Sequence, residues 1–200
     1  MDTIFLIFVI VFSAIIHEYA HGWMANQLGD QTAKYAGRLT LNPLKHIDPI
    51  GSILLPLLLI PTGFLFAYAK PVPYNPYNLR DQKWGSLKVA LAGPLSNFIL
   101  AFLFGITLQL MPASPMTGFL YIIVYANVLL GVFNLVPIPP LDGSKVLAGL
   151  GPDRFMYTIL SWERFGFILI ILFLVTGLLS SVLTPLLRFS SGLILGFPVI

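Results

Sequence analysis

The sequence predicts an all-α integral membrane protein with about four transmembrane helices. Apolar residues make up 57% of the 200 residues, only 10% are charged, and the mean hydropathy is +0.88. Soluble domains carry roughly 25% charged residues, so this composition is typical of a chain in a bilayer. Apolar runs of about 20 residues, the length that a helix needs to cross the hydrocarbon core, recur along the chain. They leave no stretch for a separate soluble core, so we expect one membrane-embedded domain over residues 1–200.

Four apolar stretches have the length of membrane-spanning helices. They cover residues 3–26, 87–110, 118–139 and 164–187. The first stretch lacks the basic leading region and the small-residue cleavage site of a secretion signal. We therefore expect it to form the first spanning helix.

A fifth stretch, residues 50–69, is long enough to span but is interrupted by Pro56, Pro61 and Gly63. Each of these residues breaks or kinks a helix and leaves backbone groups without partners. We predict a broken, re-entrant segment that enters the membrane and returns on the same side.

The basic residues of the connections predict which side each loop faces, because short cytoplasmic loops are enriched in Lys and Arg. The connections on the two sides of residues 50–69 carry Lys34, Arg38, Lys45, Lys70, Arg80, Lys83 and Lys88. The connection 111–117 carries none. Both flanks of residues 50–69 are therefore predicted to be cytoplasmic. The net charge of +3 comes without a basic run, so no nucleic-acid partner is expected.

Ionisable residues inside the apolar stretches mark the candidate site. Glu18 lies within the first predicted helix, between His17 and His21. A charged side chain at the bilayer centre costs roughly 2.5 kcal/mol or more, and such residues are candidates for function by default. The chain has no cysteine, which excludes disulfides, iron–sulfur clusters and thiolate-bound zinc. Any metal must therefore be held by His and carboxylate groups.

The spacing of these residues predicts a zinc site. His17 and His21 are four residues apart, so on a helix they share one face and can present two imidazoles to one ion. This is the HExxH pattern, in which Glu18 is not a ligand but the general base. A catalytic zinc takes three protein ligands and keeps one position open, so a third ligand is needed.

Asp142 is the better of two candidates for that third ligand. The other, His46, lies in a polar connection and is interpreted as a solvated or interfacial residue. On its own segment, Asp142 could equally belong to a turn in which it pairs with Lys145. The HExxH pattern makes the ligand interpretation preferable. Zn²⁺, one carboxylate and a hydroxide sum to zero charge, and a neutral assembly is cheaper to bury than its separate ions.

Three segments together resemble the site-2 protease family of intramembrane zinc metallopeptidases, peptidase family M50. They are residues 17–21 (His-Glu-Tyr-Ala-His), residues 92–97 (Ala-Gly-Pro-Leu-Ser-Asn) and residues 134–143, which begin with Asn134 and end with Asp142 and Gly143. The resemblance covers a core from about residue 10 to about residue 150, with 164–187 as an additional transmembrane helix. The chain is similar to the small members of the family that have no PDZ domain.

The resemblance implies that His17, His21 and Asp142 bind one zinc ion per chain and that Glu18 is the catalytic base. It implies that Asn134 positions the substrate or stabilises the oxyanion, although an interhelical hydrogen bond is an equal interpretation for that residue. The implied activity is hydrolysis of peptide bonds in or near transmembrane segments of substrate proteins. The implied partners are those proteins and the lipid bilayer, with the active site towards the cytoplasmic side of the cell membrane.

Two other features have structural and functional interpretations. Gly93 and Asn97 lie on one face of the second predicted helix, which favours close packing of another helix. Asn97 could instead reach the metal site as a hydrogen-bond partner of a ligand. Residues 38–42 alternate polar and apolar side chains, which predicts a short β element whose edge could pair with an extended substrate.

Two alternatives to the protease remain open in the sequence. A membrane protein that binds or transports a divalent metal could also use two His and two acidic residues, and an inactive family member could serve as a scaffold. Glu18 discriminates between the first alternative and the protease. A transporter gains most from Glu18 as a ligand, whereas a protease needs the carboxylate beside the metal.

Overall fold

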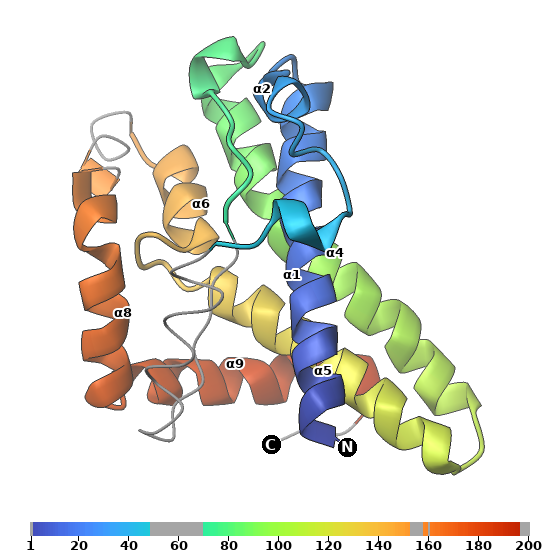
Figure 1. Ribbon diagram of the computed structural model, residues 1–200. Coiled ribbons are helices and arrows are strands. Elements are labelled where there is room, and N and C mark those ends of the chain that lie inside the picture. Colours follow the sequence, from blue (N-terminus) through green and yellow to red (C-terminus); the bar gives the residue numbers. More distant parts are fainter. Residues whose placement is uncertain (1, 49–69, 153–157, 160, 197–200) are drawn as a thin grey trace.

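The computed structural model describes residues 2–48, 70–152, 158–159 and 161–196, and its long elements are helices (Figure 1). The α-helices are α1 Asp2–Gln27, α2 Thr32–Tyr35, α4 Gln82–Leu110, α5 Pro115–Asn134, α6 Asp142–Leu150, α8 Gly166–Val175 and α9 Leu178–Leu195. Short 3-10 turns cover Pro43–Lys45, Pro76–Asn78 and Glu163–Phe165. The described part of the chain contains no strand, which confirms the all-α prediction.

Among the described residues, four helices are long and apolar enough to cross a membrane, as predicted. They are α1 from Ile4 onwards, α4, α5 and α9. The first three correspond to the predicted stretches, but α5 ends at Asn134 rather than at residue 139. Pro137, Pro139 and Pro140 follow this end, and proline supplies no backbone N–H for a continuing helix.

The boundaries predicted for the fourth helix, 164–187, are wrong. Helix α8 ends at Val175, and α9 begins at Leu178. The chain turns between them at Gly177, which has a φ of +74°. This left-handed conformation is one that glycine adopts without a steric penalty. Figure 1 shows α9 running at a steep angle to α8. With 10 residues, α8 is shorter than a membrane span, and α9, with 18, takes its place among the candidate spans.

The helix α4 is central to the packing, because it contacts α1, α5, α6 and α9. Small residues on α4 let these neighbours approach closely, as is usual where lipid tails are as apolar as the side chains. At Gly105, an added Cβ would lie only 2.5 Å from Ile194 of α9. Ala101 packs in one buried cluster with Val124 of α5. Helix α4 also packs against α1, and the candidate site lies between these two helices.

The connection before α4 is tied to the end of α1 by the buried carboxylate of Asp30. Asp30 accepts hydrogen bonds from the backbone of Asn75 at 2.6 Å, the amide of Asn78 at 3.0 Å and the backbone of Thr32 at 3.1 Å. The backbone N–H of Arg80 adds a bond to the carbonyl of Leu28. These bonds hold residues 70–81 beside the polar end of α1.

The β element predicted at residues 38–42 does not form. Its backbone and side-chain groups are paired locally instead: the N–H of Arg38 donates to the carbonyl of Ala33, the N–H of Asn42 donates to the hydroxyl of Thr40, and the Thr40 carbonyl bonds with His46 Nε2. A strand needs a partner for these groups, and the loop has already used them. The predicted re-entrant segment 50–69 lies outside the described residues.

Candidate metal centre

The first two residues of the candidate centre come from one face of α1. His17 and His21 are one turn apart on the helix, and their rings meet edge to face with centroids 4.6 Å apart. Their Nε2 atoms are 3.0 Å from each other. Both residues are buried. The predicted pairing of the two imidazoles is therefore present in the structure.

Asp142, at the first position of α6, completes the cluster. Its Oδ2 atom lies 3.0 Å from Nε2 of His17 and 3.1 Å from Nε2 of His21. Gly143 allows this placement, because a Cβ there would lie only 2.1 Å from the carbonyl oxygen of Leu135. The turn interpretation of Asp142 also specified a pair with Lys145. In the structure the Lys145 ammonium lies instead 3.8 Å from Glu163.

Both imidazoles are held from behind by α4. His21 Nδ1 lies 2.7 Å from the backbone carbonyl of Val89, and His17 Nδ1 lies 2.7 Å from Oδ1 of Asn97. Both partners are acceptors, so each Nδ1 carries a proton, and Nε2 is the ring nitrogen left to bind a metal. Asn97 thus contacts a candidate ligand, which is the functional interpretation of this residue.

Gly93 of α4 forms the wall behind the two Nε2 atoms. A Cβ at this position would lie 2.3 Å from Nε2 of His21 and 2.6 Å from Nε2 of His17. Both distances are shorter than any normal contact between such atoms. Gly93 therefore does more than let helices pack closely, because only a residue without a side chain leaves room for the two histidines.

The three converging atoms fit a zinc ion. Zinc bonds to nitrogen and oxygen ligands are about 2.0–2.1 Å long, so two ligand atoms of a tetrahedral site are about 3.3 Å apart. The atoms of His17, His21 and Asp142 are separated by 3.0, 3.0 and 3.1 Å. Two lone pairs and a carboxylate in this arrangement repel one another unless they share a cation. The chemistry of the donor set and its spacing both suit Zn²⁺ with a fourth position left open.

The charges around α6 keep the Asp142 carboxylate ionised. Burial alone would raise the pKa of Asp142, but the facing imidazoles of His21 and His17, when they are protonated in the absence of metal, outweigh burial and lower the pKa below its usual range. Burial would likewise lower the pKa of Lys145, whereas the neighbouring Tyr74, Asp142 and Glu163 raise it above the usual value. Lys145 therefore remains cationic near the cluster.

Glu18 lies on the same helix as the two histidines, and its carboxylate is not one of the three converging groups. Its Oε2 accepts a hydrogen bond of 2.7 Å from the backbone N–H of Val72. Residues 70–73, Lys-Pro-Val-Pro, are here called the proline segment. Proline has no backbone N–H, so Val72 is the only one of residues 71–73 that can donate a backbone hydrogen bond. The guanidinium of Arg38 holds this segment by donating to the carbonyl of Lys70 at 2.7 Å. Glu18 is thus positioned by the connection before α4.

The other two candidate residues from the sequence are Asn134 and His46. The Asn134 amide donates to the carbonyl of Leu130 at 2.9 Å, and none of its described hydrogen bonds reaches the cluster. Its proposed catalytic role stays a prediction. His46 is buried, with 2% of its surface exposed, so it is not a solvated residue, and the alternative of an interfacial residue stays a prediction. Its carbonyl accepts from the N–H of Lys70, which joins the two flanks of residues 50–69.

Asn127 and Val72 were not identified from the sequence. Asn127 on α5 accepts a hydrogen bond from Asn97, and Val72 acts through its backbone. A polar residue in a buried stretch of α5 was the one available signal for Asn127. No sequence pattern marks a backbone N–H, so Val72 could be found only from the structure.

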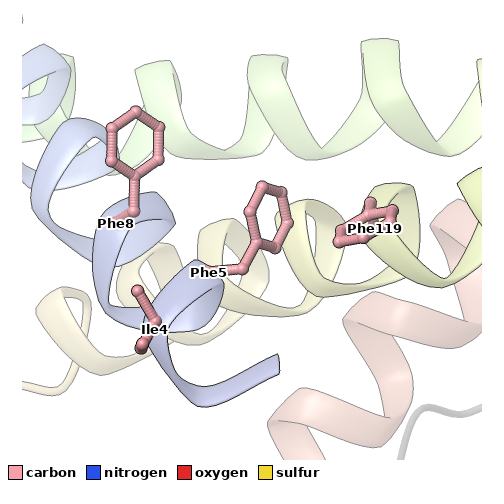
Figure 2. Close-up of a pocket in the computed structure, with 4 residues that line it drawn as sticks. All are labelled: Ile4, Phe5, Phe8 and Phe119. Carbon is pink, nitrogen blue, oxygen red and sulfur yellow. The ribbon is translucent and has the colours of Figure 1, made fainter. Parts of the chain in front are cut away.

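A separate pocket near the start of α1 is entirely apolar. It is lined by Ile4, Phe5, Phe8 and Phe119, with Phe5 and Phe119 meeting edge to face at 4.9 Å (Figure 2). The lining offers no donor, acceptor or charge for catalysis. Its nearest lining residue on α1, Phe8, precedes His17 by about two and a half turns of the helix, so this pocket is not part of the metal centre.

Comparison with known proteins identifies the family. A profile of peptidase family M50 matches residues 5–113 and 109–173. The chain belongs to peptidase family M50. A Bacillus subtilis (strain 168) protein named "Putative zinc metalloprotease YwhC" is 39% identical over 194 residues, which cover 92% of this chain and 86% of that protein.

Other M50 relatives are more distant or longer. "Putative zinc metalloprotease Rip2" of Mycolicibacterium smegmatis (strain ATCC 700084 / mc(2)155) is 32% identical over 84% of this chain and 65% of its own length. "Zinc metalloprotease MJ0392" of Methanocaldococcus jannaschii is 27% identical over 76% of this chain and 36% of its own length. No solved structure matches the chain.

The family and the apolar helices together make this M50 chain an integral membrane protein. The names of its relatives and the donor set of the cluster agree on Zn²⁺ as the cofactor. The prediction of the family from residues 17–21, 92–97 and 134–143 is confirmed.

Proposed function

We propose that this chain is an intramembrane zinc metalloprotease that hydrolyses peptide bonds in or near transmembrane segments of other proteins. The observation that supports it best is the division of roles among four residues. His17, His21 and Asp142 converge on one point, while Glu18 stands on the same helix with its carboxylate held beside that point. A hydrolase needs such a carboxylate next to the metal, free to move a proton.

The residues of the centre have separate tasks in this mechanism. Zinc, when bound, polarises the scissile carbonyl and lowers the pKa of water towards about 7. Val89 and Asn97 keep the two imidazoles turned towards the ion through Nδ1. The Val72 N–H holds Oε2 of Glu18. The carboxylate of Glu18 accepts the proton of the attacking water and delivers it to the nitrogen of the leaving amine.

The substrate must change conformation before this reaction. A transmembrane helix hides its peptide groups within its own hydrogen bonds, so the segment to be cut has to unwind locally before its carbonyl can reach the centre. The basic connections beside the polar end of α1 support an active site towards the cytoplasmic side of the cell membrane. Hydrolysis near that side would release the cytoplasmic part of the substrate.

The position of Glu18 argues against the metal-transporter alternative. A transport site for a divalent cation would gain most from Glu18 as a further carboxylate ligand. The hydrogen bond from Val72 instead holds the Glu18 carboxylate outside the cluster of His17, His21 and Asp142. The protease assignment accounts for this arrangement.

The test uses purified protein in liposomes with a panel of single-span substrates. The parent protein should cut at least one of them within or at the edge of the apolar segment, as located by mass spectrometry of the products. Glu18→Gln keeps the size of the side chain but removes the base, so turnover should fall by a factor of at least about 100 while zinc is retained. Cleavage by Glu18→Gln at the parent rate would refute the mechanism. Zinc transport by the parent without any cleavage would support the transporter.

A further inference from the structure

The two histidines of the metal centre are fixed in different ways. His21 gives its Nδ1 proton to the backbone carbonyl of Val89, a group that can only accept. His17 gives its proton to the side chain of Asn97. A carboxamide presents an acceptor oxygen on one side and a donor NH₂ on the other, so Asn97 alone does not decide which nitrogen of His17 is protonated.

The orientation of Asn97 therefore matters for metal binding. With Oδ1 towards His17, Nδ1 is protonated and Nε2 is free to bind zinc. With the amide reversed, Nδ2 would donate to Nδ1 of His17, the ring proton would move to Nε2, and that atom would lose its lone pair for the metal. The reversed state differs only by a rotation of the amide group, so another contact must exclude it.

That contact comes from Asn127 on α5. The Asn97 amide nitrogen donates to Oδ1 of Asn127 at 3.1 Å and makes a second, longer hydrogen bond of 3.4 Å to the carbonyl oxygen of Ser13. The Asn127 amide nitrogen donates in turn to the backbone carbonyl of Ile123 at 2.9 Å. This last carbonyl can only accept, so it fixes the orientation of Asn127, which then fixes Asn97.

Burial removes the usual alternative partners. Asn97 is 0% exposed and Asn127 is 1% exposed. Water cannot replace a lost partner at these positions, and an unmatched polar group there is costly. Reversal of either amide would place two oxygens or two NH₂ groups against each other.

We propose that Asn127 is a positioning residue of the metal centre, which acts through Asn97 to keep the proton of His17 on Nδ1. The path runs from the carbonyl of Ile123 through Asn127 and Asn97 to His17, and it crosses from α5 through α4 to α1. Within the described part of the chain, the hydrogen bonds of Asn127 run to Asn97 and to Ile123, and none of them reaches a candidate metal ligand directly. The proposal rests on the zinc site of the proposed function, but its readouts are zinc affinity and the tautomer of His17, and neither requires proteolysis.

The first experiment measures the ring nitrogens of the full-length, metal-free parent protein in detergent by long-range ¹H–¹⁵N spectroscopy. Both His17 and His21 should be protonated on Nδ1. In the metal-free protein Nε2 of His17 can also carry a proton towards Oδ2 of Asp142, 3.0 Å away. The result that overturns the proposal is therefore a His17 ring without a proton on Nδ1, and this measurement needs no variant.

The second experiment removes Asn127. Asn127→Leu keeps a similar volume but neither accepts nor donates, and Asn127→Ala removes the same two bonds without adding apolar bulk. In both, zinc affinity measured against a competing chelator should fall about tenfold or more, as expected when the hydrogen-bond partners of a metal ligand are lost. His17 should show a mixture of tautomers, while His21, held by the backbone, should stay on Nδ1.

Two controls separate this role from a general loss of stability. Val124→Ala lies on the same helix, three residues before Asn127, and removes a fully buried side chain. It should lower the melting temperature without changing zinc affinity. Asn127→Asp still accepts from Asn97, and a protonated carboxyl group can donate to Ile123, so affinity should stay within about threefold of the parent. An equal loss of affinity in Val124→Ala and Asn127→Leu, or parent-like affinity in Asn127→Leu, overturns the proposal.

Discussion

Gly93 shows how a single residue without a side chain shapes the metal centre. Its place on α4 would put the Cβ of any other residue 2.3 Å from Nε2 of His21 and 2.6 Å from Nε2 of His17. Gly93→Ala should therefore displace both ligands and lower zinc affinity about tenfold or more, because overpacking costs about 1–3 kcal/mol. Competition with a chelator in detergent measures this.

The matched control is Gly118→Ala on α5, where an added Cβ meets nothing within 4 Å. This substitution should leave zinc affinity unchanged. Equal affinities of the Gly93→Ala and Gly118→Ala proteins would show that the wall behind the two Nε2 atoms does not restrict the ligands.

The three proposed ligands make a second prediction at this scale. The parent should purify with about one zinc ion per chain, as a catalytic site with three protein ligands implies. His17→Ala, His21→Ala and Asp142→Ala should each lower occupancy sharply, whereas Glu18→Gln should not. Elemental analysis of the purified proteins measures occupancy. Full occupancy in Asp142→Ala would remove Asp142 from the ligand set.

The sequence was sufficient to predict the cluster and to offer Asn97 as a hydrogen-bond partner of a ligand, but it did not indicate Asn127. His17, Glu18 and His21 are close in the chain, so helix periodicity alone places them together, and Asp142 follows from the charge and the family pattern. Asn127 is 110 residues from His17 in sequence. Its role depends on how α5 crosses α4, and this crossing is decided by side-chain packing that no local pattern encodes.

At the scale of elements, the proline segment gives a prediction about the general base. Val72→Pro would leave residues 71–73 without a backbone N–H, so Glu18 would lose the donor that now lies 2.7 Å away. Hydrogen bonds to charged groups contribute about 1.5–3 kcal/mol, so kcat should fall about tenfold or more at unchanged zinc content. Val72→Ala keeps the N–H and should retain far more activity in the same assay. Similar rates for the two variants would show that this bond does not position the base.

The Asp30 carboxylate predicts how the loop that carries this segment responds to pH. Burial alone would raise the pKa of Asp30, but hydrogen bonds from Thr32, Asn78 and Asn75 outweigh it and lower the pKa below the ordinary value. The folded state therefore binds this proton less readily than the unfolded chain, in which the pKa is about 3.9. The stabilisation is present above that pH and is lost as pH falls through the folded pKa.

Asp30→Asn removes this dependence. At pH 7 the variant should be less stable than the parent by about 1–3 kcal/mol, the cost of disturbing a buried hydrogen-bonded group. The difference between the two proteins should shrink as pH falls below about 4. Melting curves in detergent at several pH values test this, and a constant difference across the range would show that the carboxylate is not the group responsible.

The elements themselves were predictable where they are long and apolar. The lengths of α1, α4 and α5 follow from runs of apolar residues between polar connections. The division of residues 164–187 into two helices did not follow, because it depends on the left-handed turn at Gly177 in an otherwise continuous apolar run. The strand predicted at residues 38–42 failed for a related reason, since alternation does not supply the second strand that a ladder needs.

At the scale of the whole molecule, hydropathy is sufficient to predict the membrane class and the number of spanning helices, and the basic residues predict their orientation. The two flanks of residues 50–69 are predicted to face one compartment. In the structure the N–H of Lys70 donates to the carbonyl of His46 at 2.9 Å, so these flanks lie together. This contact is what a common compartment requires, while the α4–α5 connection lies at the far end of a 29-residue helix.

The chain has no native cysteine, so single cysteines can report the side of each connection without further changes. Lys34→Cys and Tyr77→Cys place exposed thiols on the two flanks, and Ala113→Cys places one between α4 and α5. In sealed, right-side-out vesicles, an impermeant thiol reagent should label position 113 and leave positions 34 and 77 unlabelled until the vesicles are opened. Helix α4, a candidate membrane span, connects residue 77 to residue 113. The two positions are therefore expected on opposite sides of the membrane, and the labelling of each is the control for the other. Labelling of only one of positions 34 and 77 from outside would mean that the chain crosses the membrane between them, and the proposed placement of the proline segment and Glu18 on the cytoplasmic side would then have to be abandoned.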